Sequence, residues 1–269
     1  MYWMLTKLEW KQMLRSRWMQ LVGLLFTFVF TAIVVIQQMA LPDVTGFTRQ
    51  TASFLNVLLF LLPLFILTIS SMSVAGDVES GWFSLLKTYP MTRVQYIAGK
   101  FMASVFAFLL VVIVAFGVVF LFGGLLGGVR LPPVFISLTL LSILICTALA
   151  IFVGALAKTR LYALSLSLIL WSFFLLLLSY ALMAIGTVVA GHILQKLTII
   201  VIHLNPVEWL RFGYFIFSNQ ADVLGPAFYG LTQFYASPLG YAFYSVVTLL
   251  WVVVPLLGTG VLLKKGGRR

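Results

Sequence analysis

Residue types that support catalysis or metal binding are few in this chain and lie far apart along it. The 269 residues include six acids, two histidines and a single cysteine, Cys146. Neither a His-Glu-x-x-His pair for zinc nor a Gly-x-Ser-x-Gly turn for a nucleophile occurs. His192, His203 and the methionines suit cuprous copper as soft ligands, but no paired spacing joins them. We therefore predict no catalytic residue and no metal site. The six acids are Glu9, Asp43, Asp77, Glu79, Glu208 and Asp222.

The sequence also lacks a loop that binds the phosphates of ATP. The pattern Gly-x-x-x-x-Gly-Lys-Ser/Thr fails at Gly99-Lys100, because Val94 replaces the first glycine and Phe101 replaces the hydroxyl residue. A glycine-rich run at 123–128 has no following lysine and favours close helix packing instead. We predict no cofactor in this chain, so any energy from a nucleotide must come from another chain.

The composition indicates which kind of secondary structure carries these residues. Hydrophobic residues make up 62% of the sequence and charged residues 9%, whereas soluble domains carry about 25% charged residues. A membrane-spanning helix needs about 20 apolar residues. We predict an all-α integral membrane protein in which residues 1–269 form a single six-helix transmembrane domain. The predicted spans are 18–40, 53–75, 97–122, 134–157, 161–190 and 241–263.

Residues 1–17 precede the first apolar run and predict an interfacial helix. Lys7, Lys11 and Arg15 follow an i, i+4, i+8 spacing, which places them in one basic stripe on a helix. Trp3 and Trp10 are side chains that suit the headgroup level of a bilayer. We expect this helix to lie on the membrane surface in contact with lipid.

The distribution of basic residues predicts the orientation. With six spans, thirteen basic residues fall in the segments on the side of the termini and four fall on the other side. Basic residues concentrate on the cytoplasmic side, so we predict a multi-pass protein of the cytoplasmic (inner) membrane with both termini in the cytoplasm. The net charge of +11 thus signals topology and lipid contact, not nucleic-acid binding. The four outer basic residues are Arg49, Arg130, Lys196 and Arg211.

The acids all fall outside the predicted spans. Proton-coupled carriers and intramembrane hydrolases usually need ionisable groups at depth in the membrane. The sequence therefore argues against a secondary carrier driven by its own proton relay.

Residues 77–93 form the cytoplasmic segment with the most unusual content. Two acids precede a short amphipathic stretch at 82–86, Tyr89-Pro90 then breaks the helix, and Thr92 can cap the next helix. A short helix across the cytoplasmic ends of two spans would act as a lever for a soluble motor. The alternative is a loop that merely reverses the chain.

Residues 191–240 form the largest predicted extracytoplasmic loop. It is apolar but interrupted by His203, Asn205-Pro206, Glu208 and Arg211. We predict outer-face interfacial helices, with Pro206 in the first turn of one of them and Glu208 paired with Arg211 three residues later. We expect Asn205, Pro206, Glu208 and Arg211 to contact an extracytoplasmic partner.

The cytoplasmic segment resembles the loop of type-2 ABC exporter permeases. The residues that carry this resemblance are Glu79, Gly81, Leu85-Leu86, the run Tyr89-Pro90-Met91-Thr92-Arg93, and Gly99-Lys100. Within that superfamily the chain looks most like the NosY-type permeases of nitrous oxide reductase maturation. The run Asn205-Pro206-Val207-Glu208-Trp209-Leu210-Arg211 resembles a motif of that group.

The resemblance implies a homodimer bound to two copies of an ATPase subunit, which bind ATP and Mg²⁺. ATP-driven closure of those subunits would either export a substrate or remodel an extracytoplasmic NosD-like protein during copper-enzyme maturation. The chain itself is then not an enzyme. The residues that the resemblance places against the ATPase are Asp77, Glu79, Gly81, Trp82, Leu85, Leu86, Tyr89, Pro90 and Arg93.

Three other functions stay open at this point. A general type-2 exporter of lipid, drug or peptide fits the same apolar spans. A stand-alone membrane enzyme or assembly factor needs buried polar chemistry, and a secondary carrier would work from an ion gradient without ATP. The sequence names neither the cargo nor the outer partner, and does not say whether any cargo moves.

Overall fold

The computed structural model describes residues 2–40, 49–86, 91–125 and 132–265. Within these ranges the chain is all-α and has no strand, as the sequence predicted. The elements are α1 (Tyr2–Arg15), α2 (Arg17–Ala40), α3 (Arg49–Glu79), α4 (Trp82–Leu86), α5 (Arg93–Leu125), α6 (Pro133–Leu156), α7 (Arg160–Ser172), a π-helix (Phe173–Leu177), α8 (Leu178–Gly186), α9 (Gly191–Leu204), α10 (Pro206–Phe217), two 3-10 turns (Ala221–Leu224, Pro226–Phe228), α11 (Tyr229–Tyr235) and α12 (Pro238–Lys265).

Six helical stretches of the described chain are long and apolar enough to cross a membrane, which confirms the six predicted spans. The fifth combines α7, the π-helix and α8. The six stretches are Arg17–Ile36, Thr51–Glu79, Arg93–Gly124, Pro133–Leu156, Arg160–Gly186 and Pro238–Lys264.

Helices α3 and α5 extend several residues beyond the predicted ends of their spans. Helix α3 continues to Glu79, and α5 begins at Arg93. Asp77 and Glu79 therefore belong to α3, beyond the predicted end of its span at residue 75. Hydropathy marks only the apolar part of this helix; the Asp77 side chain that follows it is largely covered and paired with Lys100 of α5.

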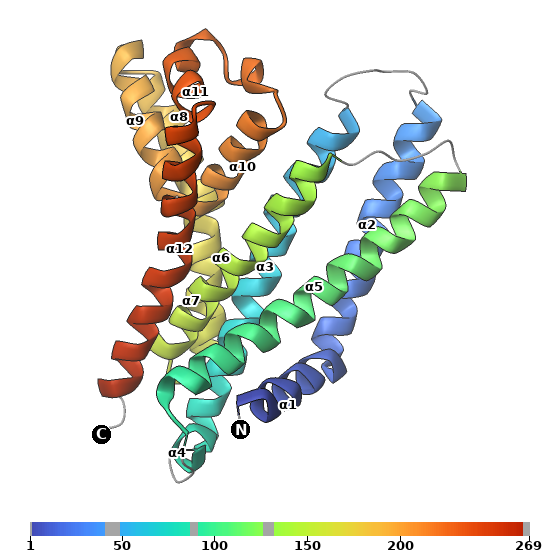
Figure 1. The fold of residues 1–269 in the computed structure, drawn as a ribbon, viewed down its shortest axis with the longest axis vertical. Coiled ribbons are helices and arrows are strands. Elements are labelled where there is room, and N and C mark those ends of the chain that lie inside the picture. Colours follow the sequence, from blue (N-terminus) through green and yellow to red (C-terminus); the bar gives the residue numbers. More distant parts are fainter. Residues whose placement is uncertain (1, 41–48, 87–90, 126–131, 266–269) are drawn as a thin grey trace.

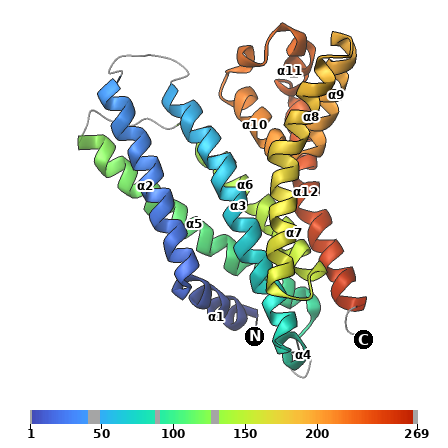
Figure 2. The same cartoon turned by 180° about the vertical axis from the view of Figure 1, so that it is seen from behind.

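The two chain ends lie at the same end of the molecule, and we call this the terminal end. Figure 1 shows α1, α4 and the end of α12 at the terminal end. Helices α9, α10 and α11 gather at the opposite end, which we call the distal end. Seen from behind, α1 runs at a steep angle to α2, as expected for a helix that lies along a membrane surface (Figure 2).

One apolar core joins the spans, with α6 at its centre. Helix α6 packs against α3, α12 and α5, and its membrane-length window is 67% buried. The fifth span is 6% buried over its window and leaves most of its apolar surface open. The buried face of α6 consists of small and branched side chains such as Cys146, Ala148, Ala150 and Ile151.

Candidate functional site

The turn between α3 and α4 is shaped by a glycine at the terminal end. Gly81 has a backbone φ of +74°, in the left-handed region that side chains with a Cβ rarely adopt. Its N–H donates to the carbonyl of Val78 at 3.3 Å, and its own carbonyl accepts from the N–H of Leu85 at 3.1 Å. Gly81 therefore ends α3 and starts α4 within one turn.

Helix α4 has an inner side and an outer side. Phe83 is buried and its ring centroid lies 5.1 Å from that of Tyr96 in α5. Trp82 is 38% exposed and Leu85 is 49% exposed. Because α4 is far too short to be stable alone, the Phe83–Tyr96 contact fixes its position and leaves two large apolar side chains facing outward.

The start of α5 carries the cap that the sequence predicted. The hydroxyl of Thr92 accepts from the N–H of Gln95 at 3.3 Å, while the N–H of Thr92 donates to the side chain of Gln95 at 3.0 Å. This reciprocal pair is a capping box. Arg93 follows it at the first position of the helix and is exposed.

Glu79 joins the end of α3 to the start of the fifth span. Its carboxylate accepts a hydrogen bond from the backbone N–H of Arg160 at 3.0 Å, and Nε of Arg160 lies 3.8 Å away. The Thr159 side chain also caps this helix start, by accepting from the N–H of Tyr162 at 3.2 Å. A carboxylate at a helix N-terminus is favourable because free N–H groups point at it. The Glu79 side chain remains 44% exposed.

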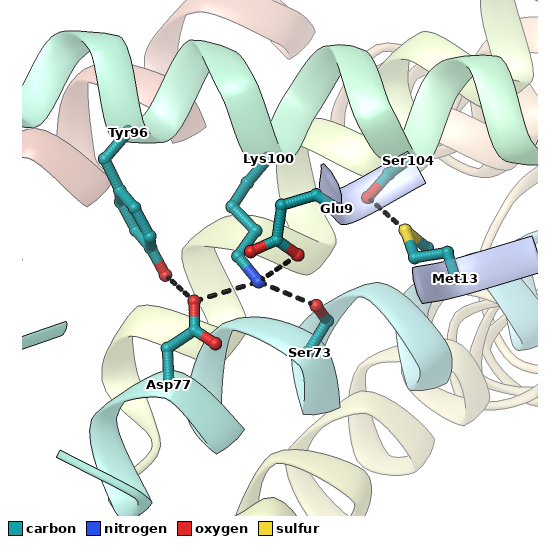
Figure 3. A network of polar contacts seen from close by, with 7 residues as sticks. All are labelled: Glu9, Met13, Ser73, Asp77, Tyr96, Lys100 and Ser104. Carbon is teal, nitrogen blue, oxygen red and sulfur yellow. Dashed lines mark hydrogen bonds and ion pairs between the residues drawn. The ribbon is translucent and has the colours of Figure 1, made fainter. Parts of the chain in front are cut away.

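A buried charge network lies directly behind this turn. The ammonium of Lys100 in α5 is 2.7 Å from Glu9 of α1, 2.9 Å from Asp77 of α3 and 3.0 Å from the hydroxyl of Ser73. The hydroxyl of Tyr96 donates to the same oxygen of Asp77 at 2.6 Å. Figure 3 shows Lys100 between these partners, so one ammonium joins three helices.

The charged side chains of this network are largely buried, and this burial affects the pKa of Glu9. The side chains of Glu9 and Lys100 are 4% and 3% exposed. Burial raises the pKa of Glu9, because it disfavours the charged form; the positive charge and hydrogen bond of Lys100 act in the opposite direction. Two carboxylates share one ammonium here, so the network carries a net negative charge when both acids are ionised.

Helix α1 reaches α5 through its face opposite the basic stripe. Leu5, Glu9 and Met13 are buried, whereas Lys7 and Lys11 are exposed. A Cβ at Gly99 would lie 2.8 Å from Cδ2 of Leu5, so a larger residue there requires the end of the Leu5 side chain to shift. A second contact joins Ser104 and Met13, whose hydroxyl and sulfur are 3.6 Å apart.

The distal end is organised by a helical hairpin, α9 and α10, whose corner is Asn205. The side-chain oxygen of Asn205 accepts from the N–H groups of Val207 and Glu208 at 3.0 and 3.4 Å, which caps α10. Its amide donates to the carbonyl of Phe174 in the π-helix at 2.6 Å. Asn205 is 0% exposed. The hairpin therefore reaches down to the middle of the fifth span.

An aromatic cluster holds the hairpin to α11 and α12. The ring of Trp209 stacks on Tyr244 at 4.5 Å, and its N–H donates to the hydroxyl of Thr248 at 3.0 Å. Nε2 of His203 lies 2.6 Å from the hydroxyl of Tyr235. Burial raises the pKa of Tyr235 to about 12, so this phenol stays protonated at neutral pH. His203 is thus a packing residue that is already hydrogen-bonded.

Comparison with known proteins gives the family. The model of the ABC-2 family transporter proteins matches residues 3–267. The chain belongs to the ABC-2 transporter family.

Two curated relatives of this ABC-2 permease carry the same name, "Probable ABC transporter permease protein NosY". The protein from Pseudomonas aeruginosa is 30% identical over 224 residues, which cover 78% of this chain and 79% of the relative. The protein from Stutzerimonas stutzeri is 28% identical over 267 residues, which cover 95% of each chain. The chain is therefore the permease subunit of an ABC transporter, and its family implies an ATPase partner.

The structure separates the residues predicted to contact the ATPase into three groups. Glu79, Gly81, Trp82, Leu85 and Arg93 are exposed at the terminal end. Leu86 belongs to α4, and Tyr89 and Pro90 lie outside the described residues. Asp77 points inward to Lys100 and Tyr96, so the structure places it behind the surface and not on it.

The outer residues also divide. Glu208 and Arg211 form the predicted pair, at 2.7 Å, with side chains 21% and 31% exposed. Asn205 and Pro206, predicted as contacts for an outer partner, are buried in the single copy. The predicted outer helices include α10, which buries its apolar face against α6.

Sequence reasoning missed Glu9, Tyr96 and Lys100 as functional candidates. Glu9 was seen only as one of the six acids of the chain, and Lys100 only as part of the family resemblance. The available signal was the spacing of Leu5, Glu9 and Met13, which puts a lone acid on the apolar face of α1. Among the described residues, no three His, Cys, Asp or Glu side chains gather as a metal site requires.

Proposed function

We propose that this ABC-2 permease forms a homodimer and that two copies of a separate ATPase subunit dock against α4. The observation that carries the proposal is the outer side of α4, where Trp82 and Leu85 are exposed beside the charged Glu79 and Arg93. An exposed aromatic anchor among polar residues is typical of a protein interface. ATP and Mg²⁺ bind in the ATPase subunit, which performs the hydrolysis.

The terminal end faces the cytoplasm in this account. Exposed basic residues of α1 and the ends of the spans gather there, which supports an inner-membrane orientation with both termini inside. The exposed basic residues at the terminal end include Lys7, Lys11, Arg15, Arg17, Arg93, Lys158, Arg160 and Lys264.

The exposed surface of the fifth span supports the proposal that two copies of the permease form a homodimer. Its window is 6% buried in one copy, and Leu168, Phe173 and Leu177 are all exposed. A second copy that packs on this surface would build a seam between the two permeases, and closure of the ATPase subunits would rock the two halves about it.

The distal end then presents the outer surface that moves. Because the named relatives are NosY permeases, we propose that this surface remodels an extracytoplasmic NosD-like protein during copper-enzyme maturation. Glu208 and Arg211 remain as partly exposed contacts, while Asn205 and Pro206 hold the hairpin that carries them.

A second candidate function is export of an amphiphile, and a cleft favours it. A cleft of about 400 Å³ opens between α1, α3, α5 and α7 at the terminal end. Phe65, Ile69 and Met72 make one side apolar, and Gln12 and Arg160 make the other polar. Lipid, drug or peptide cargo would fit such a lining.

The docking proposal is tested by co-purification of the ATPase subunit from membranes. We expect the double variant Trp82→Ala/Leu85→Ala to accumulate normally but to lose at least about tenfold of the bound ATPase, because interface anchors carry most binding energy. The matched control is Leu239→Ala/Tyr241→Ala, which removes exposed apolar side chains at the distal end. Equal ATPase recovery with all three proteins would show that α4 is not the docking site.

A further inference from the structure

The side chains that pack behind α4 connect this helix to the rest of the permease. We infer that Tyr96 and the buried triad Glu9–Lys100–Asp77 are positioning residues that make α1 follow every movement of α4. This inference rests on the proposed docking of an ATPase at α4. It assigns a role to Glu9, Tyr96 and Lys100, which the predicted coupling surface does not contain, and a different role to Asp77, which it does.

The first link joins α4 to the end of α3. Phe83 packs on the ring of Tyr96 at 5.1 Å, and Tyr96 is 2% exposed. The hydroxyl of the same Tyr96 is held by Asp77 at 2.6 Å. Tyr96 is therefore held both by the ring of Phe83 and by the carboxylate of Asp77. A displacement of Phe83 shifts the Asp77 carboxylate with it.

The second link joins α3 and α5 to α1. An ammonium has three N–H donors, and Lys100 has three acceptors within 3.0 Å: Glu9, Asp77 and Ser73. Two of these contacts, to Glu9 and Ser73, are hydrogen bonds, and the third, to Asp77, is an ion pair. A movement that separates α1 from this site breaks the ion pair between Glu9 and Lys100, which is unfavourable while Glu9 stays buried and ionised.

Together the links form an unbroken chain from Phe83 through Tyr96, Asp77 and Lys100 to Glu9, the order of contacts shown for the last four in Figure 3. The chain joins residues up to 91 positions apart, so it is independent of the local backbone. Leu5 and Met13 hold α1 along the same helix but make no polar link to α4. The polar chain is what couples the two surface helices.

The test separates this chain from transmission through the backbone alone. Tyr96→Phe keeps the ring against Phe83 and removes only the hydroxyl; Glu9→Gln keeps the shape of the side chain and removes its charge. Both changes are milder than the loss of Lys100, which risks unfolding. Ser104→Ala is the matched control, because it loosens the contact of α1 with α5 outside the chain.

The readout is a spin-label distance between α1 and the distal end. Lys11→Cys and Gln233→Cys are both exposed sites for labels, in a Cys146→Ala background, within complexes that contain the ATPase and one labelled protomer. We expect the distance to shift by several ångströms when ATP and vanadate trap the ATPase in wild type and in Ser104→Ala. In Tyr96→Phe/Glu9→Gln we expect the shift to fall to less than half, with the ATPase still bound and hydrolysing ATP.

The two single variants provide a second test of the inference. If both residues act in one chain, Tyr96→Phe and Glu9→Gln each lose most of the shift and the double variant loses little more. An unchanged shift in the double variant, or no shift in wild type with active ATPase bound, overturns the inference and leaves the docking proposal intact. Failure of the ATPase to bind wild-type permease overturns both.

Discussion

The side-chain amide of Asn205 donates a hydrogen bond of 2.6 Å to the backbone carbonyl of Phe174, in the π-helix of the fifth span. π-helical turns interrupt the regular hydrogen-bond ladder of an α-helix and often occur at functional positions. The corner of the distal hairpin is thus tied to the least regular part of the fifth span. A movement of that span would carry the hairpin with it.

Because of this hydrogen bond, we predict that substitutions of Asn205 lower the stability of the protein to different degrees. Asn205→Ala removes the cap of α10 and the bond to Phe174, and we expect it to lower the free energy of unfolding by about 1–3 kcal/mol. Asn205→Ser keeps a capping hydroxyl but is too short to reach Phe174, so its loss should be smaller. Thermal unfolding of the purified variants in detergent measures both. Equal stability of Asn205→Ala and wild type would contradict the account.

Gly81 predicts an effect that comes from the backbone alone. Because a Cβ at this position meets nothing within 4 Å, Gly81→Ala adds no clash and only forces a residue with a side chain into φ +74°. We expect a cost of about 1–2 kcal/mol and a shifted α4, with weaker ATPase co-purification. Gly81→Asn should be milder, since asparagine tolerates this conformation. If Gly81→Ala binds the ATPase as wild type does, the turn geometry does not set the docking surface.

The close approach of α1 to α5 predicts a pair of compensating substitutions. Gly99→Val places carbon atoms where Leu5 lies, and we expect it to destabilise the protein by about 1–3 kcal/mol. Leu5→Ala removes about the same volume from the other helix. The double variant should therefore be more stable than Gly99→Val alone. Additive losses in thermal unfolding would show that the two side chains do not share this space.

Glu9 predicts an unusual dependence of stability on pH. Burial raises its pKa in the folded protein above the ordinary value of 4.5. A raised pKa means that the folded state holds the proton more tightly, so the stabilisation is complete below pH 4.5 and is lost as pH rises through the raised value. The stability of wild type relative to Glu9→Gln should therefore increase as pH is lowered from 7.5 to 4.5. A constant or falling difference in unfolding temperature would be the contrary result.

The spans and local motifs were predictable from the sequence because they depend on neighbouring residues. Runs of apolar residues mark the six spans, Thr92 and Gln95 form a cap three residues apart, and Glu208 pairs with Arg211 by the same spacing. Each of these follows from helix geometry or from the thickness of a bilayer.

The charge network was not predictable in this way, because it depends on how distant helices pack. Glu9 and Lys100 are 91 positions apart, and their contact exists only where α1 crosses α5 beside α3. The sequence counts each as an isolated charge. The same limit explains Asn205, whose exposed or buried position depends on whether the outer helices lie flat or fold back against the fifth span.

The central claim, that this permease works with a separate ATPase, is tested most directly by purification of the tagged protein from native membranes with mass spectrometry of its partners. The account predicts an ATPase subunit in equal amount to the permease, together with an extracytoplasmic protein if the distal end serves a NosD-like partner. An ATPase alone would favour the exporter with its amphiphile cleft. Recovery of the permease without any ATPase would contradict the account.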